Sequence, residues 1–146
     1  MPLPPGFEVS TDRDRIDVDY VHHYLSEISY WAAGIPRDVV ARSIDNSIAF
    51  GLYAPDGGQV GFARVITDRA TFAWLSDVFI DPAMQGRRLG KAMMETIFAH
   101  PDLQDLRRFM LVTLDAHGLY QQFGFGPPPH PERLMAIVRT DLYQQD

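Results

Sequence analysis

Cysteine is absent from this 146-residue sequence, which excludes disulfides, thiolate metal sites and cysteine nucleophiles together. Long apolar runs are absent too, because none approaches the roughly 20 residues that a membrane-spanning helix needs. The first six residues have neither the basic start nor the apolar stretch of a signal peptide. These absences predict a cytoplasmic protein with no membrane partner, and no residue pattern indicates a metal site.

Positive charge is in the minority, with 13 Lys and Arg against 19 Asp and Glu and a net charge of −6. Because nucleic-acid binding depends on basic residues that neutralise phosphates, an acidic chain is a poor general partner for nucleic acid. The basic residues are nevertheless concentrated, since Arg87, Arg88 and Lys91 lie close together and Arg107 is followed by Arg108. Such a cluster in an acidic chain favours a small anion over a polymer.

Hydrophobic residues make up 46% of the chain, enough to build a core. The length predicts one domain over residues 1–146, with a core from about 7 to 140. Apolar periodicity and turn residues locate its elements. The expected strands cover residues 7–10, 47–53, 59–67, 71–80, 108–113 and 134–139, and the expected helices cover 16–31, 37–45, 89–100 and 116–123.

The connections between these elements predict the topology. Short turns between the three strands of residues 47–80 indicate an antiparallel meander. The strand, helix and strand from 71 to 113 indicate a right-handed parallel unit, with the apolar strand 108–113 central and buried. We therefore expect an α/β or mixed α+β fold whose mixed sheet is mostly antiparallel and flanked by helices.

Residues 77–92 are the most informative segment, because a strand ending at Ile80 passes through a glycine- and arginine-containing loop into an amphipathic helix. The free N–H groups and positive dipole end of a first helical turn form an anion site. Gly86 and Gly90 would let a phosphate approach the backbone closely. The spacing matches neither the nucleoside-triphosphatase loop nor the dinucleotide-binding fingerprint, so those two classes are not indicated.

Gln85 to Gly90 resembles the Gln/Arg-x-x-Gly-x-Gly/Ala signature of the GCN5-related N-acetyltransferase (GNAT) superfamily, which follows a strand and often Asp-Pro, here Asp81-Pro82. Arg88 stands where that family usually has its first glycine, and an arginine side chain can turn outward and leave the anion site intact. Leu119 to Phe125 is similar to a second family segment, aromatic-Tyr-x-x-x-Gly-Phe. The order of elements matches over nearly the whole chain.

The resemblance implies acetyl-CoA as co-substrate and a splayed parallel pair of strands at the centre of the sheet. The pantetheine arm would lie in the splay, where a backbone N–H near Phe79 or Ile80 could polarise the thioester carbonyl. The pyrophosphate would rest on N–H groups from Arg87 to Lys91. The implied cofactor-binding residues are Val78, Phe79, Ile80, Gln85, Gly86, Arg87, Arg88, Leu89, Gly90, Lys91 and Ala92.

Attack of an amine on a thioester needs a base for the ammonium proton and an acid for the thiolate. Tyr120 matches the family's usual acid, and a phenol with a pKa of about 10 is protonated at neutral pH. Asp77 is a candidate base, with Asp115, His117 and a water chain as alternatives. Tyr30, Trp31 and Arg64 are candidate walls of the acceptor pocket, by their position in the fold.

The expected function is therefore acetyl-CoA-dependent N-acetylation of a primary amine on a small molecule or peptide, by direct attack in a ternary complex. An alternative is a non-catalytic acyl-CoA-binding module or sensor with the same fold. A third hypothesis is another donor, such as succinyl- or propionyl-CoA. The acidic composition favours a cationic or neutral amine. Homodimers are common in the family, so a homodimer is a further possibility.

Overall fold

The computed structural model describes residues 3–143, and its centre is one five-stranded sheet. The strands follow one another in the spatial order β1-β2-β3-β4-β5, antiparallel except for the parallel pair β4 and β5. Their bounds are β1 Glu8–Ser10, β2 Ile48–Tyr53, β3 Gln59–Thr67, β4 Phe72–Ile80 and β5 Arg108–Met110.

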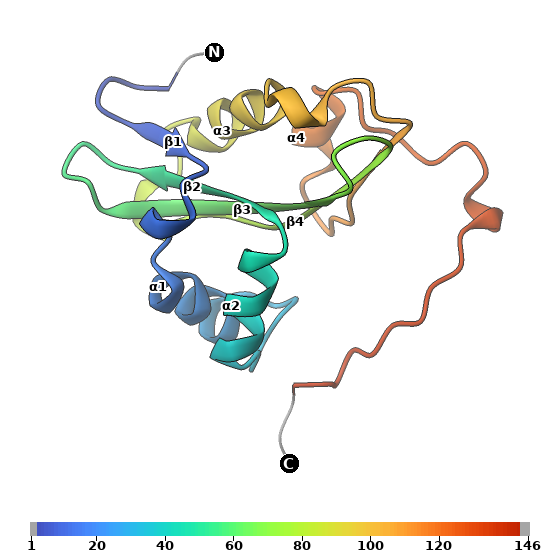
Figure 1. Ribbon diagram of the computed structural model, residues 1–146, viewed down its shortest axis with the longest axis horizontal. Coiled ribbons are helices and arrows are strands. Elements are labelled where there is room, and N and C mark those ends of the chain that lie inside the picture. Colours follow the sequence, from blue (N-terminus) through green and yellow to red (C-terminus); the bar gives the residue numbers. More distant parts are fainter. Residues whose placement is uncertain (1–2, 144–146) are drawn as a thin grey trace.

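Helices cover both faces of this sheet (Figure 1). On one face lie α1 (Val18–His23), which continues into the π-helical turn η2 (Tyr24–Ile28), and α2 (Arg37–Asp45). On the other lie α3 (Leu89–Phe98) and α4 (His117–Gln121). The short 3-10 turns are η1 Arg13–Arg15, η3 Pro82–Met84, η4 Pro101–Leu103 and η5 Pro131–Arg133. Over residues 3–143, no helix combines the length and the apolar content needed to cross a membrane.

Two hydrophobic cores result, one on each face. Alternate β2 residues Ile48, Phe50 and Leu52 pack with Met93 and other apolar residues of α3. On the opposite face, apolar residues of α1, η2 and α2 pack with Phe62 and Phe79 of β3 and β4. Because successive side chains of a strand point to opposite faces, β3 and β4 serve both cores, and the end of β4 is held between two helical layers.

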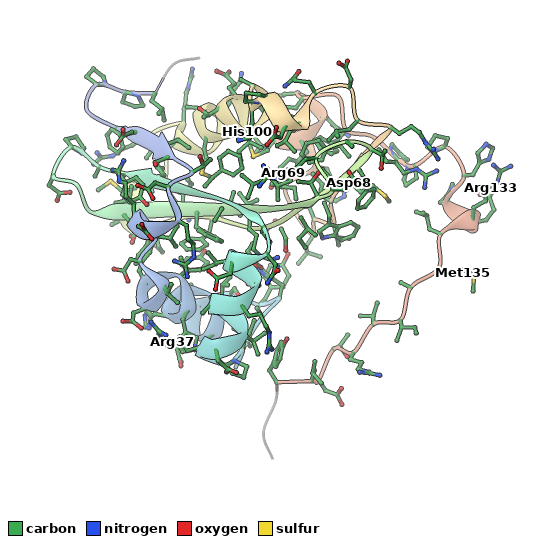
Figure 2. The ribbon with its side chains drawn as sticks, in the orientation of Figure 1. Arg37, Asp68, Arg69, His100, Arg133 and Met135 are labelled. Carbon is green, nitrogen blue, oxygen red and sulfur yellow. The ribbon has the colours of Figure 1, made fainter. Side chains whose placement is uncertain are left out.

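The β3–β4 turn has a clear sequence cause. One carboxylate oxygen of Asp68 accepts hydrogen bonds from the N–H groups of Ala70, Thr71 and Phe72. These bonds, with one from the Thr71 hydroxyl, hold the pKa of Asp68 well below its usual range. Figure 2 shows Asp68 and Arg69 at this end of the sheet. The expected meander is confirmed, and the turn fixes the register of β4.

Several expected elements differ from the structure. The fold class is confirmed, but the parallel pair lies at the edge of the sheet, so the expectation that 108–113 is central and buried is wrong. The expected strand 134–139 is also wrong, because the described chain there is extended and unpaired. The expected helix 16–31 is shorter and changes to a π-helical turn, while α2 has the expected bounds.

Candidate active site

The first part of the site is the outer edge of β4, which is only partly paired. β5 pairs with β4 over residues 72–74 alone among the described residues. β3, in contrast, accompanies β4 to its last residue, where Gly61 faces Ile80. From Leu75 onward, the edge of β4 away from β3 therefore has no strand partner in the described part of the chain, which matches the splay expected in front of the loop that precedes α3.

The backbone direction along this edge follows from one hydrogen bond. The N–H of Asp81 donates to a β3 carbonyl at 2.8 Å, so its backbone faces β3. Because these directions alternate along a strand, Phe79 also faces β3, whereas Ile80 and Val78 face the unpaired side. The Gln85 side-chain nitrogen lies 3.5 Å from the Ile80 carbonyl oxygen. Of the two N–H groups considered for the thioester carbonyl, that of Ile80 thus has the suitable direction.

The second part of the site is the start of α3. No side chain within residues 3–143 caps it, whereas the Asp17 carboxylate caps α1. The N–H groups of its first turn therefore have no helical or capping partner. Residues 85–88 are exposed, while the Leu89 and Ala92 side chains are buried, so these two can offer a ligand only their backbone. Uncapped amides next to exposed basic side chains suit a diphosphate.

The loop before α3 contains two left-handed residues, Gly86 with φ of 84° and Arg88 with φ of 58°. Glycine adopts this conformation without steric cost, whereas an L-residue with a side chain does not. Arg88, which stands at the family's usual glycine position, therefore keeps a glycine-like backbone. The chain accommodates arginine at this position by a left-handed backbone, at the cost of local strain.

We expect Arg88→Gly to raise the free energy of unfolding by up to about 1 kcal/mol, because it relieves the left-handed strain. The loss of an exposed arginine contact costs less than that. Arg87→Gly is the matched control: Arg87 has no left-handed strain to relieve, so the added backbone freedom should lower stability. Chemical denaturation measures both variants, and equal destabilisation by the two would contradict the strain argument.

A β-bulge positions Asp77, the candidate base. The register between β3 and β4 shifts between Phe62 and Arg64, and Asp77 has a φ of 55°. Its Oδ2 accepts a 3.0 Å hydrogen bond from Arg64 Nε and its Oδ1 one of 3.0 Å from Trp31 Nε1. Bulges re-aim side chains in this way. The structure thus brings together Asp77 and two of the three residues expected at the acceptor pocket.

Tyr30, the third of those residues, links this group to Tyr120. The Tyr30 and Trp31 rings meet edge to face at 5.1 Å, and both side chains are largely exposed. Burial is the main cause that raises the pKa of the Tyr120 phenol, and the neighbouring Asp115 and Tyr30 raise it further. The Tyr30 ring therefore contacts Trp31 directly and influences the candidate acid through its charge.

Tyr120 itself is 8% exposed on the short helix α4. No buried side-chain nitrogen or oxygen in the described chain lacks a hydrogen-bond partner, and the Tyr120 hydroxyl makes no hydrogen bond to another described residue. Its ring is therefore in the core while its hydroxyl reaches the surface. The alternative bases Asp115 and His117 precede it and are exposed.

Sequence reasoning missed two tyrosines that support the site. Tyr24 stacks on Phe79 of β4 at 3.8 Å, almost parallel. Tyr20 donates a 3.0 Å hydrogen bond to Asp81, which also accepts from the N–H of Ala83. Burial and this bond raise the Tyr20 pKa far above its usual value. The spacing of four residues on a helix was the available signal, and it indicates that these tyrosines share one face.

The turn that carries Tyr30 and Trp31 is built by buried Ser29. Its hydroxyl donates to the Leu25 carbonyl at 2.6 Å and accepts from the N–H of Ala32 at 3.2 Å. The preceding turn, Tyr24–Ile28, is π-helical, a form often found at functional sites. The exposed aromatic pair is therefore held on a defined turn.

We expect Arg64→Met to lower the free energy of unfolding by about 1–3 kcal/mol, because the Asp77 carboxylate, 9% exposed, would keep a single donor. Arg37→Met is the matched control, since Arg37 pairs with Asp19 on the exposed surface, where a pair contributes less than about 1 kcal/mol. Urea denaturation compares the two. Equal effects would mean that the Asp77 pair is no more important than a surface pair.

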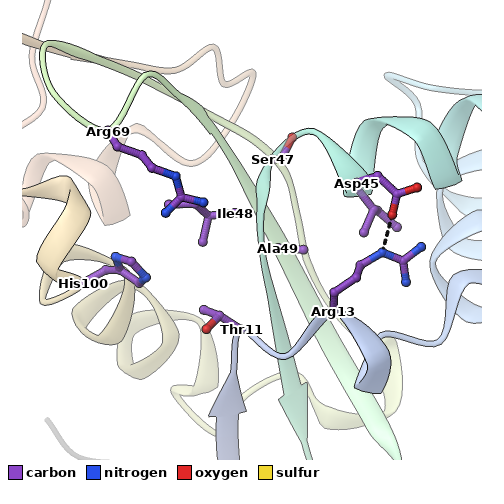
Figure 3. A pocket seen from close by; sticks show the side chains of 9 residues that line it. Thr11, Arg13, Asp45, Ser47, Ile48, Ala49, Arg69 and His100 are labelled. Carbon is purple, nitrogen blue, oxygen red and sulfur yellow. Dashed lines mark hydrogen bonds and ion pairs between the residues drawn. The ribbon is translucent and has the colours of Figure 1, made fainter.

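A surface pocket of about 280 Å³ lies elsewhere on the molecule (Figure 3). The first residues of β2 form part of its lining. Arg69 of the β3–β4 turn and His100 lie on one side of the pocket, and the Arg13–Asp45 ion pair lies on the other. Since His100 lies just beyond the end of the ten-residue helix α3, the pocket is roughly 15 Å along this helix from the α3 start. It belongs to a different part of the surface from the splay.

The sequence profile described as acetyltransferase (GNAT) domain matches residues 46–127, which include the splay, the α3 start and Tyr120. A solved structure from Xanthomonas campestris pv. campestris, whose title places it in the GNAT family of acetyltransferases, is 50% identical with a TM-score of 0.94 and covers 97% of this chain and 99% of its own. A Gibberella zeae protein named as an acetyltransferase is 34% identical over 77% of this chain and 74% of its own. Serotonin N-acetyltransferase 2 of Oryza sativa subsp. japonica is 28% identical over 92% of this chain and 69% of its own.

Proposed function

This chain belongs to the GNAT family of acetyltransferases, and from that premise we propose that it uses acetyl-CoA to acetylate a primary amine. The observation that carries the proposal is one junction: a β4 edge without a strand partner leads into an uncapped helix start flanked by Gly86 and basic side chains. The edge offers backbone groups to a pantetheine amide, and the helix start offers N–H groups to a pyrophosphate.

In the proposed reaction, the neutral amine attacks the thioester carbonyl while the Ile80 N–H donates to its oxygen. A new C–N bond forms, and the C–S bond then breaks. The ammonium proton passes to a base, and the Tyr120 hydroxyl gives its proton to the departing thiolate. The Tyr120 phenol is protonated over the whole neutral range, since its ordinary pKa is about 10 and burial raises this pKa further.

Asp77 is the proposed base or its water-bridging partner. Each of its oxygens accepts one protein hydrogen bond, from Arg64 or from Trp31, and an oxygen of a carboxylate can accept a second. The same two donors fix the carboxylate at the β4 bulge. Asp115 and His117, which are close to Tyr120 in the sequence, are the alternative candidates for the base.

The amine acceptor is proposed to enter over Tyr30 and Trp31. The Tyr30 and Trp31 rings contact one another, and Trp31 donates a hydrogen bond to Asp77, so an ammonium group would meet aromatic faces and a carboxylate. The rice relative is named for serotonin, an aromatic amine. A small aromatic or aliphatic amine suits this open aromatic wall better than a polyanion.

Release of free thiol from acetyl-CoA across a panel of amines tests the proposal. The panel contains arylalkylamines, diamines, amino acids and lysine peptides, and parallel assays replace acetyl-CoA with propionyl- or succinyl-CoA. Amine-dependent thiol release with mass-spectrometric detection of the N-acetyl product is expected. Calorimetric binding of acetyl-CoA without release with any amine would instead indicate the acyl-CoA-binding module.

A further inference from the structure

Arg64 is the cation that the structure places against Asp77, the proposed base. Its Nε donates to Asp77 Oδ2 at 3.0 Å, its Nη1 to the Ser47 hydroxyl at 3.1 Å and its Nη2 to the Ser76 hydroxyl at 3.3 Å. Each of its three nitrogens therefore already donates to a protein oxygen. Its positive charge is also countered, because the Asp77 carboxylate is its ion-pair partner.

A guanidinium engaged in this way is a poor receptor for the carboxylate of a substrate. Arginine recognises carboxylates through two parallel N–H···O bonds from its planar fork. In Arg64 every nitrogen of the fork has a protein acceptor, and the side chain is only 14% exposed. A substrate carboxylate would therefore have to compete with Asp77 and two serine hydroxyls for the same donors.

Asp77 itself keeps acceptor capacity that an ammonium group can use. Each of its oxygens accepts one protein hydrogen bond, from Arg64 or from Trp31, and a carboxylate oxygen has room for two. An amine bonded to Asp77 would hold a carboxylate on its own α-carbon within roughly 5 Å of the Asp77 oxygens, since the hydrogen bond spans about 2.8 Å. The Asp77 side chain is 9% exposed, so salt screens this repulsion less than at the surface.

The other side chains proposed to line the acceptor site are aromatic or lie beside a carboxylate. Tyr30 and Trp31 present rings whose faces attract cations and repel anions. The charge of Asp115 acts on the Tyr120 phenol and raises its pKa, so the proposed acid has a carboxylate near it too. A neutral or cationic amine meets compatible groups here, whereas an α-amino acid brings a third negative charge to Asp77 and Asp115.

We infer that the acceptor is a free amine without an α-carboxylate, and that the Arg64–Asp77 pair selects against α-amino acids. The inference rests on the proposed function and narrows its substrate class to small decarboxylated amines, with an aromatic group suited to Tyr30 and Trp31. The selection comes from the repulsion and the occupied donors that the wrong substrate meets. The class of reaction that must supply such an acceptor is the decarboxylation of an amino acid, which releases carbon dioxide and leaves a primary amine.

Matched pairs of acceptors test the preference in the natural protein at pH 8, where ordinary imidazoles are neutral. Phenethylamine is compared with phenylalanine, and tyramine with tyrosine, by thiol release from acetyl-CoA. We expect kcat/KM of each amine to exceed that of its amino acid by at least about 100-fold. Phenylalanine methyl ester separates charge from size, and it should recover most of the lost rate. Equal kcat/KM within a pair, or an ester as poor as the acid, would overturn the inference.

Binding gives a second readout that needs no turnover. In calorimetric titration, with and without coenzyme A, phenylalanine should bind at least about tenfold more weakly than phenethylamine. If this preference appears but no amine causes thiol release, the proposed catalysis fails and the inference about the site stands. Equal binding of the two would overturn the inference even if acetyl transfer is observed.

Ser76→Ala tests whether Arg64 is responsible. The change removes the acceptor of Nη2 and frees that nitrogen for a substrate carboxylate, so the ratio of kcat/KM between phenethylamine and phenylalanine should fall about tenfold. Ser43→Ala is the matched control, because the Ser43 hydroxyl donates to the Val40 carbonyl and makes no hydrogen bond to Arg64. The control should keep the natural ratio. An unchanged ratio in Ser76→Ala, or an equal fall in both variants, would contradict selection by the Arg64–Asp77 pair.

Discussion

Tyr120→Phe is expected to lower turnover by about 100-fold to 10,000-fold, the usual contribution of a positioned general acid. The Tyr120 hydroxyl makes no hydrogen bond to another described residue, so its removal should leave stability nearly unchanged. Affinity for acetyl-CoA should also be retained, because the phosphates are assigned to the α3 start. Steady-state thiol release and calorimetric titration measure the two effects separately.

Tyr53→Phe is the matched control, and its expected pattern is the opposite. Tyr53 is buried, and its hydroxyl donates to the Arg15 carbonyl at 2.9 Å, away from the splay. Its loss should cost about 1 kcal/mol of stability and leave turnover unchanged. If Tyr120→Phe kept full turnover, or if both variants lost turnover equally, Tyr120 would not be the acid.

The pH dependence of the natural enzyme follows from the same residue. The proposed acid, Tyr120, would act in its protonated form, and burial raises its pKa above the usual value of 10.0. In a profile of thiol release against pH, loss of the Tyr120 proton is therefore expected to lower turnover only above about pH 10.

Gly90→Val is expected to weaken acetyl-CoA binding by at least about tenfold, or 1.4 kcal/mol. A Cβ at Gly90 would meet no protein atom closer than Ile80 Cγ1 at 3.9 Å, an ordinary contact. Valine is also a better helix former than glycine, so α3 should keep its stability. The added methyl groups would instead occupy the space in which a phosphate approaches the first helical turn.

Two controls accompany Gly90→Val in calorimetric titration with acetyl-CoA. Gly118→Val places the same side chain in α4, where no atom lies within 4 Å of the new Cβ, and should leave affinity unchanged. Gly90→Ala adds one carbon and should have a smaller effect than valine. Unchanged affinity in Gly90→Val with an intact fold would remove the pyrophosphate from this helix start.

Local sequence signals were sufficient to predict an element wherever a single residue determines the backbone conformation at its end. Pro36 has the backbone that precedes a first helical turn, and α2 begins and ends as predicted. The Asp68 carboxylate accepts hydrogen bonds from the N–H groups of its own turn, so the turn and the antiparallel meander could be predicted from the sequence. The loop before α3 was readable as a candidate anion site for a similar reason, because its glycines and its helix start lie within a few residues, and its binding of phosphate stays a prediction.

Features that depend on distant partners could not be predicted in this way. Residues 134–139 have strand composition, but a strand also needs a neighbour, and the described chain provides none. The apolar content of residues 108–113 indicated a central strand, whereas the observed β5 is an edge with Val112 exposed. The Asp77 bulge and the Tyr24–Phe79 stack join segments far apart in sequence, so no local pattern reveals them.

The central claim is that the start of α3 and the free edge of β4 bind the cofactor, and amide chemical shifts during a titration with acetyl-CoA test it most directly. The account predicts the largest shifts at the N–H groups of residues 86–91 and of Ile80. Large shifts around the pocket of Arg69 and His100, with the α3 start unmoved, would contradict it.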